Sequence, residues 1–75
     1  MLEKKIVIIG AKKIHSKAKN QDYYLVEYVK DGTYQKDYIN EQEYEKLSSK
    51  AKPMVEQIGI FNVNLYNKIY LCDVK

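Results

Sequence analysis

The residue types that most often catalyse reactions or bind metals are scarce in this 75-residue chain, which has one histidine, His15, and one cysteine, Cys72. A nucleophilic cysteine needs a base and a third group that orients the base, and a zinc site needs about four ligands at characteristic spacing. The sequence contains neither pattern. Cys72 lies in the apolar segment 70–74, which favours a small buried thiol, and the three glycines are too far apart for a phosphate-binding loop. We therefore expect no enzyme activity, no catalytic residue, no metal and no cofactor.

Lysines are concentrated near the start of the chain. Residues 1–20 contain six lysines and one acid, a net charge of +5, whereas residues 21–48 contain seven acids and three lysines, a net charge of −4. Every basic residue is lysine, and bidentate reading of guanine favours arginine. A lysine-only surface therefore predicts sequence-independent contacts with phosphates, although a solvated turn beside an edge strand is the alternative. The candidate phosphate-binding lysines are Lys12, Lys13, Lys17, Lys19, Lys30 and Lys36.

Tyrosines follow these lysines at strand-like spacing. An exposed tyrosine can stack on any base for about 1–3 kcal/mol, whichever base it meets. The alternative is that the rings only cover the core, with their hydroxyls in water. The candidate base-stacking residues are Tyr23, Tyr24, Tyr28 and Tyr34.

The pattern of residues predicts that strands surround these candidates. A first strand is expected over about 5–13, with a bulge at Gly10, followed by a polar loop over 16–22. Strands over 23–30 and 33–39 are joined by Asp31-Gly32, a strong two-residue hairpin signal. The expected register places Glu27 opposite Lys36. We predict that the mixed polar and apolar face with Tyr24, Val26, Tyr28, Lys30, Gln35 and Asp37 is exposed, and that the face with Leu25, Val29, Tyr34 and Tyr38 is buried.

A helix is expected next, because Asn40 is a good N-cap and Glu43 completes a capping box. Pro53 ends the helix before Lys52. Strands over 55–65 and 69–74 follow, with a turn at 66–68. The order β-β-β-α-β-β is that of the OB-fold, a five-stranded Greek-key barrel with a helix between its third and fourth strands. An SH3-like barrel and an α+β meander are the alternatives.

Length and composition predict one domain over residues 1–75. No segment approaches the ~20 apolar residues that span a bilayer, and the apolar run 6–9 is too short for a signal peptide. A single cysteine forms no internal disulfide, which points to a reducing compartment, so we expect a cytoplasmic protein without membrane contact. Because a chain this small buries little surface alone, we also expect a homodimer.

Two segments resemble a known family. Residues 16–27, a basic loop followed by an aromatic strand, and residues 59–65 are similar to the small phage single-stranded DNA-binding proteins of the gene V type. The resemblance implies an OB-like dimer that coats single-stranded DNA during DNA replication. It also implies DNA contacts by Lys17, Lys19, Tyr23 or Tyr24, and Tyr34. This chain differs from the family in the helix signal after residue 39 and in having no arginine.

These observations predict a protein that binds single-stranded DNA or RNA with little sequence preference. Of the two, DNA is the expected ligand. The alternative from another class is a protein–protein interaction module, such as a phage- or plasmid-encoded inhibitor of a host protein. Glu41 and Glu45 of the helix, or an uncovered strand edge, would then form the working surface. A structural subunit of a larger assembly is a third hypothesis.

Overall fold

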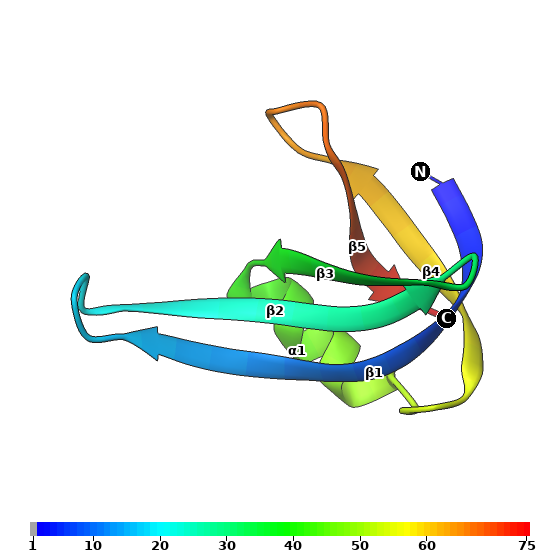
Figure 1. Cartoon of the computed structure of the whole chain (residues 1–75), viewed down its shortest axis with the longest axis horizontal. Coiled ribbons are helices and arrows are strands. Elements are labelled where there is room, and N and C mark those ends of the chain that lie inside the picture. The colour runs from blue at the N-terminus through cyan, green and yellow to red at the C-terminus, as the bar shows by residue number, and fades with distance from the viewer. Residues whose placement is uncertain (1) are drawn as a thin grey trace.

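The computed structural model describes residues 2–75, so Met1 of the predicted 1–75 domain lies outside the described residues. The order of elements over 2–75 is the predicted one (Figure 1). The elements are β1 (Leu2–Ser16), β2 (Gln21–Lys30), β3 (Thr33–Ile39), α1 (Glu41–Lys50), β4 (Glu56–Val63) and β5 (Ile69–Val74). None of the helices within this range is long and apolar enough to cross a membrane.

The strands of residues 2–75 form one sheet in the order β3-β2-β1-β4-β5, and each neighbouring pair is antiparallel. The expectation of a mostly β chain with one helix between β3 and β4 is therefore confirmed. The sheet is not closed into a barrel, because β3 and β5 share no backbone ladder. A side chain joins these two edges instead, since Asp37 Oδ2 accepts a hydrogen bond of 2.9 Å from the backbone N–H of Leu71.

Strand β1 is long and pairs with two neighbouring strands, β4 and β2. Its first residues, 2–7, pair with β4, and its later residues pair with β2 up to the pair Ser16–Gln21. The register shifts between Ile8 and Gly10, which confirms the predicted bulge. Such a bulge bends a strand and increases its twist. Beyond it, β1 and β2 run on as a two-stranded arm that projects from the molecule (Figure 1). The arm reduces the predicted loop over 16–22 to a turn over 17–20.

The hairpin of β2 and β3 has the predicted register, including Glu27 opposite Lys36. The prediction of which hairpin face is exposed is wrong for most of its residues, although Leu25 is buried as predicted. Val26, Tyr28 and Ile39 belong to the core, whereas Tyr34 and Tyr38 are exposed. The reason is that α1 and β5 cover the face that carries Val26, Tyr28 and Asp37. The buried carboxylate of Asp37 has hydrogen-bond donors there. Its carboxylate accepts a 2.5 Å hydrogen bond from the Tyr28 hydroxyl and the bond from Leu71.

Helix α1 has the predicted capping box. Asn40 Oδ1 accepts from the N–H of Glu43 at 2.8 Å, and Glu43 Oε1 accepts from the N–H of Asn40 at 3.0 Å. The helix buries Leu47 in the core and ends before Pro53, as expected. Strand β4 stops at Val63 and not at residue 65, because the side chain of Asn64 accepts hydrogen bonds from the N–H groups of Tyr66 and Lys68 and forms the turn.

Candidate nucleic-acid interface

Strands β1, β2 and β3 present one face away from the core, which we call the outer face. Side chains alternate along each strand, so the register places residues from all three strands on this face. The opposite face packs under α1 and β5. The outer face consists of Lys12, Ile14, Tyr23, Leu25, Glu27, Val29, Tyr34, Lys36 and Tyr38.

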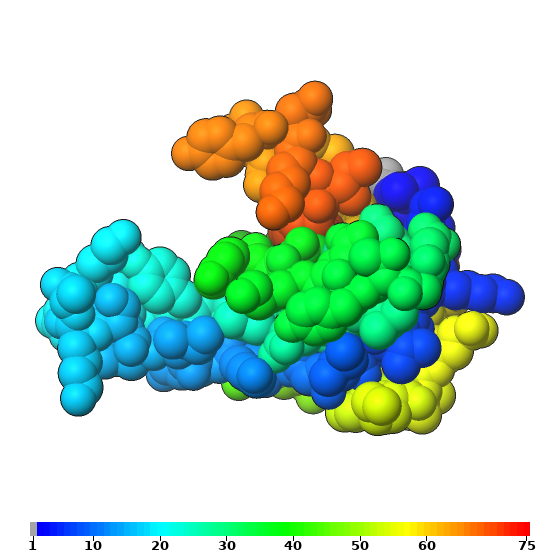
Figure 2. All heavy atoms as spheres, in the orientation of Figure 1, coloured from blue at the N-terminus to red at the C-terminus, as the bar shows by residue number. Residues whose placement is uncertain are grey.

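The end of the outer face toward the arm is hollowed. A hollow of about 410 Å³ is lined by Ile14 of β1, Lys19 of the arm turn, Tyr23 of β2 and Tyr38 of β3. The rings of Tyr23 and Tyr38 meet edge to face, with their centroids 6.5 Å apart, and the Tyr38 side chain is 62% exposed. Figure 2 shows the arm standing clear of the body of the molecule, which leaves this end of the face open. An apolar floor, two rings and one ammonium group suit a flat aromatic ligand that carries negative charge.

The middle of the outer face holds a carboxylate. Glu27 Oε1 lies 2.9 Å from Lys12 Nζ, and Glu27 Oε2 accepts a hydrogen bond from the Tyr34 hydroxyl. Lys36 is its cross-strand neighbour. The hydrogen bonds from Tyr34 and Lys12 hold the pKa of Glu27 below its ordinary value. The same contact raises the pKa of Tyr34, because ionised Tyr34 could no longer donate to the carboxylate.

Six of the ten predicted nucleic-acid-binding residues lie on or beside this surface. Lys12, Tyr23, Tyr34 and Lys36 are on the outer face. Lys17 and Lys19 are exposed in the arm turn that borders it.

The other four predicted residues point elsewhere. Tyr28 is only 1% exposed, so the prediction that it stacks on a base is corrected: its ring packs on Phe61 in the core. Lys30 is half-buried, with its ammonium group 5.0 Å from the centre of the Phe61 ring. Lys13 and Tyr24 lie on the opposite face of the arm, where Lys13 is 3.6 Å from Asp22 and Tyr24 packs on a tyrosine of α1. These four do not join the outer face.

Two residues of the hollow, Ile14 and Tyr38, were not predicted as part of the site. Tyr38 was assigned to the buried face together with Tyr34. The predicted register already put Tyr34, Lys36 and Tyr38 on one face. The sequence carried no signal that this face is the exposed one, because the opposite face also carries charged residues, Lys30 and Asp37.

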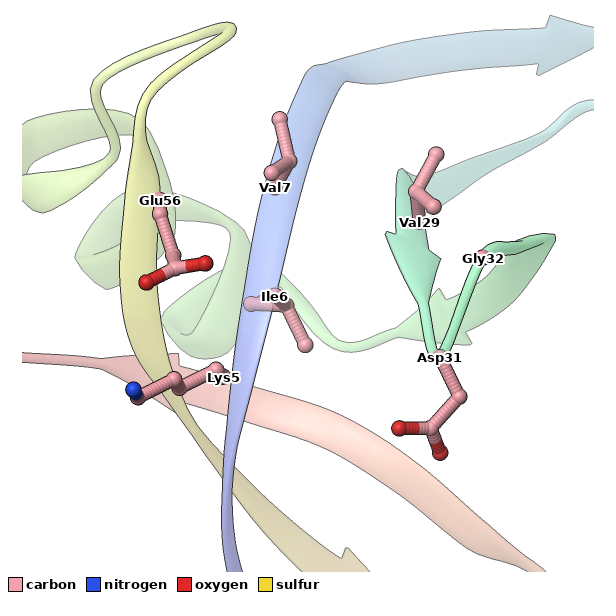
Figure 3. Close-up of a pocket in the computed structure, with 7 residues that line it drawn as sticks. All are labelled: Lys5, Ile6, Val7, Val29, Asp31, Gly32 and Glu56. Atoms are coloured by element: carbon pink, nitrogen blue, oxygen red, sulfur yellow. The ribbon is translucent and has the colours of Figure 1, made fainter.

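A second hollow in the described chain is less suited to bind nucleic acid. A hollow of about 300 Å³ lies where β1, the β2–β3 turn and the start of β4 meet (Figure 3). Glu56 and Asp31 lie on opposite sides of β1 in this view, with only Lys5 as a cation, so the hollow would repel phosphate.

The histidine and the cysteine are far apart in the fold. His15 is exposed on the arm, 2.8 Å from an oxygen of Asp22, and Cys72 is buried in β5. Burial raises the pKa of the Cys72 thiol. Over residues 2–75, no cluster of three or more histidine, cysteine or acidic side chains is arranged to hold a metal ion.

The comparisons with known proteins identify no relative: no family model matches the chain, and no curated protein or solved structure gives a significant match. The geometry of the outer face therefore carries the functional interpretation.

Proposed function

We propose that the protein binds single-stranded nucleic acid, DNA in the first place, on its outer face with little sequence preference. The observation that carries this proposal is the hollow of Ile14, Lys19, Tyr23 and Tyr38. Rings in this hollow stack on a base, and Lys12, Lys17, Lys19 and Lys36 neutralise phosphates around it. Bases in a duplex are stacked on each other and offer no free face to a tyrosine, so the hollow favours a single strand.

We further propose that the sheet is an OB-like barrel that is open between β3 and β5. The bend in β1 lets this strand pair with β4 through its first half and with β2 through its second half. The bond from Leu71 to Asp37 then spans the remaining gap. Oligonucleotides bind OB-folds on the face of strands 2 and 3 and on the flanking loops, where the outer face and the arm turn lie.

Titration with oligo(dT), followed by tyrosine fluorescence, tests the function. Quenching is expected to saturate. Three to four lysine contacts would give a slope of log K against log salt of about −2 to −3, at about −0.7 per phosphate, because Lys12 is already paired with Glu27. Oligo(rU) and a DNA duplex run in parallel test the preference for DNA and for a single strand. Absence of binding at ~50 mM salt, where such contacts are strongest, would refute the proposal.

Substitution of a ring locates the site. Tyr38→Ala is expected to weaken oligo(dT) binding by about 5- to 150-fold, the equivalent of losing ~1–3 kcal/mol of stacking. Tyr66→Ala is the matched control, because Tyr66 is 89% exposed in the β4–β5 loop and is not part of the outer face. Equal losses in the two variants would contradict a site on the outer face.

A second candidate function, protein–protein interaction, is favoured by one observation. An apolar cluster is exposed at the end of the sheet where β4, β5 and the start of β1 meet, beside a hollow of about 270 Å³. Exposed apolar groups gathered in one place often mark a protein interface. The cluster consists of Leu2, Val63 and Ile69, which line this hollow together with Phe61 and Asn62. A pull-down from nuclease-treated lysate would detect a host protein on this surface, and the oligomeric state would reveal a second copy of the chain.

A further inference from the structure

Glu27 is an acid at the centre of the outer face, whose other members are lysines, tyrosines and apolar residues. Its carboxylate is held by groups from two neighbouring strands, the ammonium of Lys12 on β1 and the hydroxyl of Tyr34 on β3. Lys36 lies opposite it on β3. Only 16% of the Glu27 side chain is exposed, against 63% for Lys12. The carboxylate therefore sits within the face, beneath the lysine that a ligand would meet.

The Glu27 oxygens contact one lysine and one hydroxyl, with a second lysine on the neighbouring strand, and donors of these kinds also bind phosphate groups. We propose that Glu27 is a built-in competitor that occupies this anion site in the free protein and limits the affinity for a polynucleotide. A backbone phosphate that approaches Lys12 must displace the carboxylate, or share the lysine with it at the cost of repulsion between two anions. This inference rests on the proposed function and names the residue that regulates its strength.

Position supports a regulatory role over a purely structural one. Glu27 lies between the hollow at the arm and the Tyr34 end of β3, so a strand that leaves the hollow along β3 passes over it. The Lys12 side chain is 63% exposed, and an ion pair that is open to solvent on its lysine side contributes little to stability. Removing the charge should therefore change binding more than folding.

The test compares Glu27→Gln with Glu45→Gln in oligo(dT) titrations from ~50 to ~300 mM salt. Both variants raise the net charge by one, but Glu45 lies on α1, on the opposite side of the sheet. Glu27→Gln is expected to bind about 5- to 10-fold more tightly than wild type at ~50 mM salt. The salt slope should steepen by about 0.7, the value for one additional phosphate contact. Glu45→Gln should change affinity less than twofold, because its charge is screened over a Debye length of ~10 Å.

The outcomes separate the inference from the function on which it rests. Unchanged or weaker binding by Glu27→Gln, with wild type still binding, would overturn the inference and leave the function standing. An equal gain in both variants would also overturn it, because net charge alone would then explain the effect. If neither wild type nor Glu27→Gln binds oligo(dT), the proposed function itself fails. Urea unfolding of both variants verifies that each is folded.

Discussion

At the scale of single residues, Asp37 explains how an acid lies in the core of a very small sheet. The residue is 4% exposed, and its carboxylate accepts hydrogen bonds from the Tyr28 hydroxyl and the Leu71 N–H. One side chain thus satisfies two buried donors from different strands. The desolvated hydroxyl and its bond to Asp37 raise the pKa of Tyr28 strongly, so this phenol stays protonated.

Replacement of Asp37 tests this account. Asp37→Ala leaves the Leu71 N–H without an acceptor and weakens the bonding of the Tyr28 hydroxyl, so the free energy of unfolding is expected to fall by about 2–3 kcal/mol. Urea unfolding measures the loss. Glu45→Ala, on the exposed surface of α1, is the control and should cost less than about 0.5 kcal/mol. Equal stability of the two variants would show that Asp37 does not connect β3 and β5 energetically.

The carboxylate of Glu27 also predicts a dependence of stability on pH. Its pKa in the folded protein is depressed by Tyr34 and Lys12. The folded state therefore gains stability from Glu27 above the ordinary glutamate pKa of about 4.3, and loses it as the pH falls through the lower folded value. Wild type should lose more stability than Glu27→Gln between about pH 5 and pH 2 in urea unfolding. Parallel curves for the two proteins would contradict the ion pair.

At the scale of elements, the two glycines inside strands have different physical roles. A Cβ at Gly59 in β4 would lie 2.7 Å from a methyl group of Ile6 and 2.9 Å from one of Leu71, and both of these residues are buried. A Cβ at Gly10 would meet nothing within 4 Å. Gly59 is therefore required by close packing across the sheet, whereas Gly10 only accompanies the bulge in β1.

These glycines form a matched pair for mutation. Gly59→Ala overfills the core and should destabilise the protein by about 1–3 kcal/mol. Gly10→Ala should stay within about 1 kcal/mol of wild type, because alanine restricts the unfolded chain and meets no obstacle in the fold. Thermal and urea unfolding measure both. A large loss for Gly10→Ala would mean that the bulge needs a backbone conformation that only glycine adopts.

Local interactions made several elements predictable from the sequence. The Asp31-Gly32 turn determines the pairing of β2 with β3, since the turn length sets the register. Asn40 and Glu43 mark the start of α1 by bonds between residues three apart. The ends of β1 and the start of β2 were less predictable, because the polar arm residues 11–16 and 21–24 form a ladder with each other and carry no clear apolar alternation.

At the scale of the whole molecule, two surfaces of different chemical character suggest two different binding partners. Figure 1 shows the arm and the β4–β5 loop projecting in different directions from the sheet. Lysines and tyrosines gather toward the arm, and the exposed apolar cluster lies at the β4–β5 end. Nucleic acid on the first surface and a second copy of the chain on the other could be accommodated together.

The oligomeric state tests this division. We expect sedimentation equilibrium to give about twice the chain mass of 8.9 kDa for wild type, because a chain of this size gains buried surface by association. Val63→Asp places a charge in the apolar cluster and should shift the protein to monomer. Thr33→Asp, exposed at the edge strand β3, is the control and should leave the dimer intact. A monomeric wild type would exclude the second copy as the partner of this surface.

The sequence by itself determined the order of elements, the hairpin register, the helix cap and the group of lysines and tyrosines from which a binding face is built. These follow from alternation, turn chemistry and capping, which act over a few residues. Only the tertiary structure decided which hairpin face is buried. The two faces of β2 and β3 are similar in apolar content, and the choice depends on the packing of α1 and of the distant strand β5, which brings the Leu71 N–H to Asp37. That choice put Tyr28 in the core and Tyr38 in the hollow.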